Sequence, residues 1–203
     1  MEKMHYAEVF GFFLLFFLIG GVPFGLLIAR LKKVELRKIG SGNIGATNVY
    51  RALGLRYAIL VFVLDGMKGA LPVLICEWYY GRGFLAGLAG LISVLGHIFS
   101  PYLKFRGGKG VATGFGALLV ISPLASLISF AVWLFIVALT KIVGLGSIIS
   151  AVLVPVWILF FKEDDWILYS AIGIVAVAIF SHHQNIRRLL KGEEKKIGKI
   201  KQG

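Results

Sequence analysis

The sequence contains very little cysteine and few charged residues for its length. A single cysteine, Cys76, stands among 203 residues, which excludes an intramolecular disulfide and a structural metal site built from a cysteine cluster. Charged residues make up 16% of the chain, hydrophobic residues make up 58%, and the mean hydropathy is +0.86. Soluble globular domains do not reach such values. The chain is therefore predicted to be an all-α, polytopic membrane protein that forms one domain over residues 1–203.

Acidic residues are scarce, and the basic residues are unevenly distributed. The chain has 22 Lys and Arg against 10 Asp and Glu. A basic excess can indicate a nucleic-acid partner, but in a membrane protein the distribution of charge is the better guide. Lys and Arg concentrate in 30–56, 104–109, Lys141 and 187–201. We therefore expect membrane lipid, and no nucleic acid, beside these segments.

The apolar stretches predict membrane-spanning helices, at about 20 residues per crossing. They occupy residues 9–29, 57–76, 83–103, 111–140, 142–161 and 166–181. Residues 111–140 would form a helix of about 45 Å, too long for one crossing. Ser122-Pro123 near its middle predicts a short helix, a tight turn and a longer returning helix. Counting both limbs gives seven helices, and treating the bend as re-entrant gives five.

Either count is odd, so the two ends of the chain are predicted to lie on opposite sides of the membrane. All four basic segments then fall on one side. By the positive-inside rule this side is cytoplasmic, with the N-terminus outside and the C-terminus in the cytoplasm.

Residues 39–54 form the first polar segment of chemical interest on this face. Ser41, Asn43, Thr47 and Asn48 lie among glycines and are followed by Arg51. Hydroxyl, carboxamide and amide groups can bind oxyanions without adding negative charge of their own. The same residue types also fit a turn followed by a capped helix.

Residues 104–116 form the second segment, which combines glycines with Lys104, Arg106 and Lys109. Glycines let backbone amides approach a phosphate, and the apolar run that follows predicts a helix whose N-terminus favours an anion. A flexible basic loop that contacts anionic lipid is the alternative. A nucleotide P-loop is excluded, because Leu103 occupies a required glycine position and Gly110 a required Ser or Thr position.

The third segment begins at the end of the last apolar stretch, with His182, His183 and Asn185. The histidines could bind metal, act as a general base or close a helix. His182 and Asn185 share a face if the helix continues. Inside the apolar stretches, Asp65 and Lys68 are spaced to form an ion pair, and His97 is either a packed histidine or a functional one.

Taken together, these segments resemble the bacterial acyl-phosphate:glycerol-3-phosphate acyltransferases, the PlsY family. The resemblance rests on GSGNIGATNVYR at 40–51, LDGMKG at 64–69, GHIFSPYLKFRGGKGVAT at 96–113 and HHQNIRRLLKGEEKK at 182–196. It implies transfer of a fatty acyl group from acyl phosphate to the sn-1 hydroxyl of glycerol 3-phosphate, giving lysophosphatidate and inorganic phosphate. It also implies a multi-pass protein of the bacterial inner membrane with its active site at the cytoplasmic face.

The resemblance implies roles for individual residues. Catalytic roles fall to Ser41, Arg51, His182 and Asn185. Substrate-binding roles fall to Asn43, Thr47, Asn48, Lys68, His97, Lys104, Gly107, Gly108, Lys109, Gly110 and Thr113. Glu194 matches an acidic position with a structural role, and His183 stands where the family more often has a basic residue, so it is given no catalytic role.

Two questions stay open at this level. Either His182 or a phosphate oxygen of the acyl donor could accept the hydroxyl proton. The same glycines and lysines could also form the anion site of a phosphate or organophosphate transporter, although transporters place such sites near the membrane midplane between internal repeats, and no repeat is found here. No metal and no cofactor are expected, and a monomer is the expected state.

Overall fold

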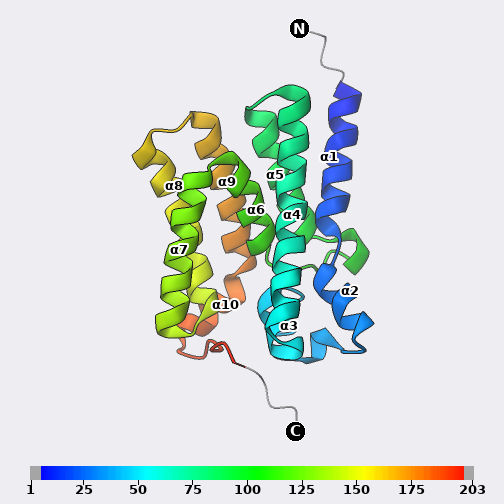
Figure 1. Cartoon of the computed structure of the whole chain (residues 1–203), viewed down its shortest axis with the longest axis vertical. Coiled ribbons are helices and arrows are strands. Elements are labelled where there is room, and N and C mark those ends of the chain that lie inside the picture. The colour runs from blue at the N-terminus through cyan, green and yellow to red at the C-terminus, as the bar shows by residue number, and fades with distance from the viewer. Residues whose placement is uncertain (1–5, 199–203) are drawn as a thin grey trace.

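The chain folds into a bundle of helices, described by a computed structural model for residues 6–198 (Figure 1). No strand occurs within this range. The α-helices are α1 (Tyr6–Gly21), α2 (Phe24–Leu31), α3 (Ala46–Leu53), α4 (Leu55–Tyr80), α5 (Phe84–Ile98), α6 (Val111–Ile121), α7 (Pro123–Thr140), α8 (Val143–Phe161), α9 (Asp165–Ser181) and α10 (His183–Leu190). Two short 3-10 helices, η1 (Leu36–Lys38) and η2 (Pro101–Leu103), lie in the connections.

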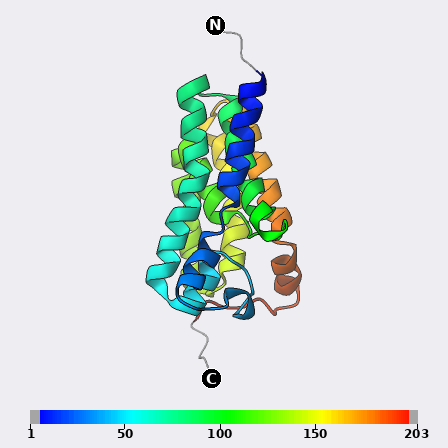
Figure 2. The same ribbon diagram turned by 90° about the vertical axis from the view of Figure 1, so that its right-hand side faces the viewer.

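The long helices run side by side along the longest axis of the molecule, and the short helices α2, α3 and α10 lie at one end (Figures 1 and 2). The beginning of α1 lies at the opposite end from α10. Helix α6 is shorter than its neighbours and begins partway along the bundle, after the connection that carries the glycine-rich segment (Figure 1).

Five segments are long and apolar enough to cross a membrane, namely Tyr6–Leu31, Leu55–Tyr80, Phe84–Leu103, Pro123–Thr140 and Val143–Phe161. The pair α9 and α10 raises the number to six if it counts as one bent span. Helix α6, with 11 residues, is only about 16 Å long. The prediction of an all-helical membrane bundle is confirmed, whereas the count of seven and the orientation of the chain ends stay predictions. Residues 199–201 of the predicted basic tail lie outside the described residues.

The bend at Ser122-Pro123 divides residues 111–140 into a short helix and a longer returning one, as the sequence predicts. Two other predicted helices are interrupted unexpectedly. Residues 9–29 break at Val22-Pro23 between α1 and α2, because proline has no amide hydrogen to donate. The carbonyl of Ile19, four residues before Pro23, accepts from the Val22 amide at 3.1 Å. At the break, the Gly21 carbonyl accepts from Ser100 Oγ at 2.6 Å and the Val22 carbonyl accepts from Lys68 Nζ at 2.7 Å.

The second interruption separates α9 from α10 by a bend of 60°. His182 is the residue between the two helices, and Asn185 lies in the first turn of α10. The predicted sharing of one continuous helical face therefore does not occur. The bend nevertheless leaves both side chains buried, with exposures of 3% and 4%.

Helices α4 and α6 pack very closely through glycines. A Cβ atom at Gly69 would clash with the carbonyl group of Thr113, and one at Gly116 would clash with the carbonyl group of Gly66. Small residues permit such approach in membrane proteins, where packing replaces the hydrophobic effect between helices. This contact fixes the start of α6 against the middle of α4.

A smaller core supports the polar end of the molecule. Leu26 and Ala29 of α2, Leu36 of η1, Val49 of α3 and Val61 of α4 are buried against one another. Since residues 39–45 connect η1 to α3, this packing positions the first polar segment beside the membrane-spanning helices.

Candidate active site

A cavity of about 630 Å³ lies between the helices and brings the three polar segments together. One part of its wall is polar and includes Ser41, Asn43, Thr47, Asn48, Arg51, Lys109, His182, Asn185, Arg188, Glu194 and Lys195. The other part is apolar and includes Leu55, Ile59, Phe62, Phe115, Leu118, Phe130, Trp133, Leu134 and Val154. The cavity can therefore accommodate a molecule with an anionic head and a hydrocarbon tail.

The first polar segment is held in place by its own asparagines. Asn48 is buried; it accepts a hydrogen bond from the Ser41 amide at 3.1 Å and donates one to the Leu36 carbonyl at 3.0 Å. Asn43 accepts from the Gly45 amide at 3.1 Å. As a result, Gly45, Ala46 and Thr47, at the N-terminus of α3, line the cavity. The amides of a first helical turn favour an anion.

The glycine-rich segment uses its glycines mainly to approach α5. The amides of Gly107 and Gly108 donate to the carbonyls of Ile98 at 2.9 Å and His97 at 3.1 Å, so they are occupied within the protein. A Cβ atom at Gly108 would clash with the imidazole of His97. The part of this segment that lines the cavity is Lys109, Gly110 and the first turn of α6, a second helix N-terminus directed at the same space.

A chain of polar contacts joins the second and third segments. Lys109 Nζ donates to Asn185 Oδ1, Asn185 Nδ2 donates to Glu194 Oε1 at 2.6 Å, and Arg188 Nε donates to the other oxygen of Glu194 at 2.7 Å. Ser181 Oγ also donates to the carbonyl of Lys109, at 2.9 Å. Glu194 thus positions one amide and one guanidinium, which agrees with a structural role.

The C-terminal residues of the described chain pass across the polar mouth of the cavity. Arg51 donates to the carbonyls of Lys195 and Lys196, at 3.5 and 3.4 Å, and Lys195 Nζ donates to the Gly40 carbonyl at 2.7 Å. The Ile197 amide donates to the Lys141 carbonyl at 2.6 Å. Residues 195–197 thereby connect the first polar segment to the turn between α7 and α8.

Burial changes the protonation of two groups at the polar end. It lowers the pKa of Lys109 from 10.5 to about 8, an effect that Glu194 opposes and Arg188 and Arg51 reinforce. It also lowers the pKa of His182 from 6.5 to about 4. His182 Nδ1 lies 2.7 Å from the Ala178 carbonyl, which requires a proton on Nδ1 and leaves Nε2 as an acceptor. At neutral pH, Lys109 is a cation and His182 is neutral.

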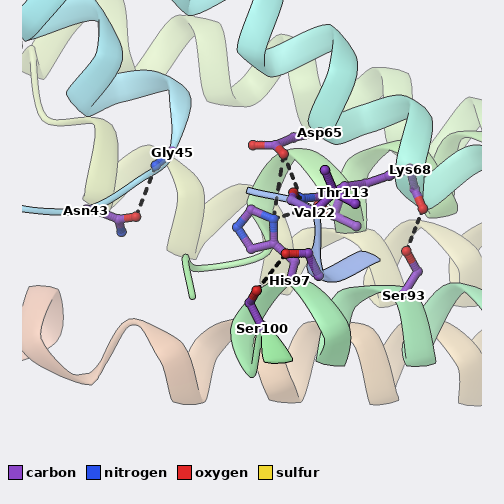
Figure 3. A network of polar contacts seen from close by, with 10 residues as sticks. Val22, Asn43, Gly45, Asp65, Lys68, Ser93, His97, Ser100 and Thr113 are labelled. Carbon is purple, nitrogen blue, oxygen red and sulfur yellow. Dashed lines mark hydrogen bonds and ion pairs between the residues drawn. The ribbon is translucent and has the colours of Figure 1, made fainter. Parts of the chain in front are cut away.

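A buried polar cluster lies beside the cavity (Figure 3). Asp65 Oδ1 is 2.7 Å from Lys68 Nζ and 3.8 Å from His97 Nδ1, and Thr113 Oγ1 is 3.2 Å from the same nitrogen of His97. The predicted ion pair between Asp65 and Lys68 is confirmed. Ser93 Oγ donates to the Lys68 carbonyl at 2.5 Å, a group left free because Pro72 cannot donate to it.

The predicted site residues divide into two groups. Ser41, Asn43, Thr47, Asn48, Arg51, His97, Lys109, Gly110, His182 and Asn185 line the cavity. Lys68, Lys104, Gly107, Gly108 and Thr113 do not: Lys104 is exposed, Lys68 and Thr113 are buried in the polar cluster, and the two glycines pack on His97. Within residues 6–198, no three His, Cys, Asp or Glu side chains are grouped so that they could hold a metal ion.

Sequence reasoning did not select Ser147 or Lys195, and it treated Arg188 only as part of a basic tail. Ser147 accepts a hydrogen bond from the indole of Trp133 at 3.2 Å and lines the cavity. The available signal was the run of small residues at the start of α8, Gly144, Gly146 and Ser147, close after Lys141.

Comparison with known proteins decides the family. The family model described as glycerol-3-phosphate acyltransferase matches residues 10–192. The chain belongs to this family. The glycerol-3-phosphate acyltransferase of Thermosipho melanesiensis is 42% identical over 87% of this chain and 86% of its own length. That of Aquifex aeolicus is 44% identical over 88% and 93%.

Solved structures agree with the sequence comparison. A crystal structure of PlsY, an integral membrane glycerol 3-phosphate acyltransferase, in its glycerol 3-phosphate form aligns with a TM-score of 0.89 at 42% identity, covering 94% of this chain and 96% of that one. The lysophosphatidic acid form aligns with a TM-score of 0.88 at 41% identity and the same coverage. The chain is thus an integral membrane acyltransferase of phospholipid biosynthesis, and the resemblance to the PlsY family is confirmed.

Proposed function

We propose that this protein transfers a fatty acyl group from an acyl phosphate to the sn-1 hydroxyl of glycerol 3-phosphate. The observation that supports this most directly is the composition of the cavity wall. A donor-rich, cationic end with Arg51, Lys109 and two helix N-termini suits phosphate groups, and it continues into apolar walls that suit an acyl chain.

Glycerol 3-phosphate is the acceptor named for the PlsY structure that this chain resembles. We assign direct contacts with the two phosphate groups to Arg51, Lys109, Ser41 and the first turns of α3 and α6. Asn43, Thr47, Asn48, Gly110, His182 and Asn185 complete this wall. Lys68, Lys104, Gly107, Gly108 and Thr113 do not line the cavity, so we assign them no direct contact with the substrates.

The reaction requires little from the protein beyond positioning and charge stabilisation. The sn-1 oxygen of glycerol 3-phosphate attacks the carbonyl carbon of the acyl phosphate, and the bond from that carbon to the phosphate oxygen breaks. Lysophosphatidate forms and inorganic phosphate leaves. Donors such as Ser41 and Lys109 stabilise the developing negative charge, and fixed substrates lower the entropic cost.

The proton of the attacking hydroxyl can pass to His182 or to a phosphate oxygen of the donor. His182 has its Nε2 available as an acceptor, but with a pKa of about 4 it is a weak base. The donor phosphate is the stronger base of the two. We therefore assign His182 the role of orienting the hydroxyl, with the phosphate accepting the proton.

The acyl tail is proposed to reach the cavity from the bilayer. Leu55, Ile59 and Leu134 line the cavity and are also exposed by 63%, 53% and 50%, so the wall formed by α4 and α7 is partly open to lipid. Since the basic segments surround the polar mouth, we place this mouth at the cytoplasmic face of a bacterial inner membrane, with the protein as a monomer and a single domain.

The test is phosphate release from palmitoyl phosphate by purified protein in lipid, with and without glycerol 3-phosphate, together with mass detection of the lipid product. Release that depends on the acceptor and yields acyl-glycerol phosphate is the expected result. Binding of glycerol 3-phosphate without release or product would reject the proposal and make flux into liposomes, as a transporter would give, the next measurement.

A further inference from the structure

Positive charge without acidic partners gathers where α2 ends and α4 begins. Residues 22–64 contain seven Lys and Arg but one acidic residue, Glu35, which pairs with Lys38. Lys32 directly follows α2, and Arg56 lies in the first turn of α4. Both side chains are exposed, and within residues 6–198 neither forms an ion pair with Asp or Glu. This end of the molecule therefore presents cations that the protein itself does not neutralise.

The ring of Tyr57 brings two of these charges to one place. Lys32 Nζ lies 5.3 Å and Arg56 Cζ lies 4.6 Å from the centroid of the ring, and the three residues together form the Tyr57 cluster. An aromatic ring attracts a cation but carries no net charge, so the two cations held beside it still repel each other. A bound anion would relieve this repulsion and accept charge-assisted hydrogen bonds from both side chains.

The two cations lie where the apolar part of each helix ends. Lys32 directly follows the apolar span Tyr6–Leu31, and Arg56 is the second residue of the span Leu55–Tyr80. Helices α2 and α4 contact each other, and Figure 1 shows them side by side at the end of the bundle that carries α3 and α10. Lys and Arg at the ends of spans reach the lipid headgroups, and tyrosine is frequent at the same level. The Tyr57 cluster is thus placed at the membrane surface.

Exposed leucines continue from the cluster toward the apolar part of the membrane. Leu27 and Leu31 on α2 are exposed by 42% and 81%, and Leu60 on α4 by 45%. A lipid complements both features, since its phosphate fits the cations and its acyl chains fit the leucines, whereas a soluble anion uses only the cations. The three residues of the Tyr57 cluster do not line the cavity, so this surface is separate from the site proposed for the acyl donor.

We infer that the Tyr57 cluster binds the phosphate of an anionic phospholipid in the leaflet beside the polar mouth of the cavity. This lipid is neither substrate nor product, so the site does not depend on the proposed function. Lys32 and Arg56 stand immediately before and after residues 33–55, which carry Ser41 and Arg51 into the cavity wall. One bound phosphate therefore connects both ends of this segment and stabilises its position.

The direct test measures which lipid the full-length protein retains. Purified protein in detergent is offered equal amounts of phosphatidylglycerol and phosphatidylcholine with the same acyl chains, and native mass spectrometry identifies the first lipid bound. The two cations should favour phosphatidylglycerol by about five- to thirtyfold, and Lys32→Gln together with Arg56→Gln should reduce this preference by at least about threefold. The matched control, Arg187→Gln together with Lys191→Gln, removes the same charge from exposed positions at the same end of the molecule and is expected to keep the preference.

Several results would overturn the lipid site. No preference in the wild type, or an equal reduction in both pairs of variants, would show that the position of Lys32 and Arg56 does not matter. Release of the bound lipid by an equal amount of inorganic phosphate would assign the cluster to a free anion. A higher KM for palmitoyl phosphate in the Lys32→Gln and Arg56→Gln protein, measured in phosphatidylcholine alone, would assign it to the acyl donor.

Reconstitution tests the consequence for the segment between the two cations. When phosphatidylglycerol replaces part of the phosphatidylcholine in vesicles, KM for glycerol 3-phosphate should fall by about two- to fivefold in the wild type and the control, and should not fall in the Lys32→Gln and Arg56→Gln protein. An anionic surface alone repels glycerol 3-phosphate and raises KM, so a decrease cannot come from general surface charge. Acylation with the same KM response in all three proteins rejects the stabilising role of the lipid. Lipid retention without acylation in any vesicle rejects the proposed function and leaves the lipid site intact.

Discussion

The polar end and the apolar walls of the cavity are built in different ways. At the polar end, Lys109, Asn185, Glu194 and Arg188 form one chain of hydrogen bonds, and Arg51 donates to carbonyls near the C-terminus. These partners come from segments far apart in the sequence. The apolar walls have few such bonds and consist of side chains such as Phe62 and Phe130 that touch through their rings.

This difference indicates how each part tolerates change. When a charged side chain is removed from this chain of hydrogen bonds, its partners have no other group to bond to. The removal therefore also disturbs the neighbouring side chains. An apolar side chain contributes area, and a neighbour or a lipid chain can fill part of the space it leaves. Substitutions at the polar end should therefore cost far more activity than substitutions in the walls.

The largest effect is expected from Lys109→Met, which removes the cation between the start of α6 and Asn185. Phosphate binding and charge stabilisation are both lost, and kcat/KM should fall by about 10²- to 10³-fold. The control is Arg106→Met, in the same connection but exposed and outside the cavity. Steady-state phosphate release in lipid measures both. Similar losses in the two variants would show that general positive charge matters and that the position of Lys109 does not.

The next effect is expected from Glu194→Gln. An amide cannot accept from Asn185 and balance Arg188 as a carboxylate does, so kcat/KM should fall by about 10- to 100-fold through misplacement of Asn185 and Lys109. Glu193→Gln, an exposed neighbour, should retain wild-type activity. The proposed positioning role predicts that the loss appears mainly in KM for glycerol 3-phosphate, and a loss confined to kcat would contradict it.

The polar end was also the part that sequence reasoning could find. Polar residues and glycines destabilise a membrane protein where they replace apolar residues, so they are kept mainly where they have a function. The Ser, Asn, Gly, Lys and His residues of 39–54, 104–116 and 182–185 could therefore be recognised in the sequence. The expectation that these three segments come together rested only on their lying at the same face of the membrane. The role of Gly107 and Gly108 could not be predicted, because the sequence does not distinguish a glycine that packs against His97 from a glycine that lies beside a phosphate.

The apolar walls could not be found in this way. Phe62, Phe115 and Phe130 are residues of the same type as those that face lipid, and only the packing of α6 against α4 and α7 turns them inward. The helix interruptions also differed in whether the sequence predicted them. Ser122-Pro123 was recognised because its stretch was too long for one crossing, whereas Pro23 fell near the end of a stretch of ordinary length. The bend at His182 follows from tertiary contacts such as that of Ser181 with the Lys109 carbonyl.

The pH dependence should show which charged group limits the polar end. Lys109 has a pKa of about 8, so its cation is present below that pH and is lost as pH rises through it. Accordingly, kcat/KM should fall by up to about tenfold per pH unit above 8. In Lys109→Arg this alkaline decrease should disappear, because arginine stays charged. Its persistence in that variant would assign it to another group.

The same profile tests His182. With a pKa of about 4, this histidine is neutral throughout the range from pH 6 to 9, so His182→Gln should lower kcat modestly and leave the shape of the profile unchanged. A decrease near pH 6.5 that is present in the wild type and absent in the variant would instead identify His182 as the base.

The smallest effect is expected from Phe130→Ala in the apolar wall. The ring of Phe130 lies 5.0 Å from that of Phe115 and 5.7 Å from that of Trp133, centroid to centroid, and all three line the cavity. Removing it deprives an acyl chain of part of its contact, worth roughly three- to tenfold in kcat/KM for palmitoyl phosphate. An eight-carbon donor gains less from this wall and should lose less. Leu127→Ala is the control, on the same helix but 54% exposed and outside the cavity. Equal losses for long and short donors would mean that the tail does not pass Phe130, and the contrast between the two parts of the cavity would then hold only for its polar end.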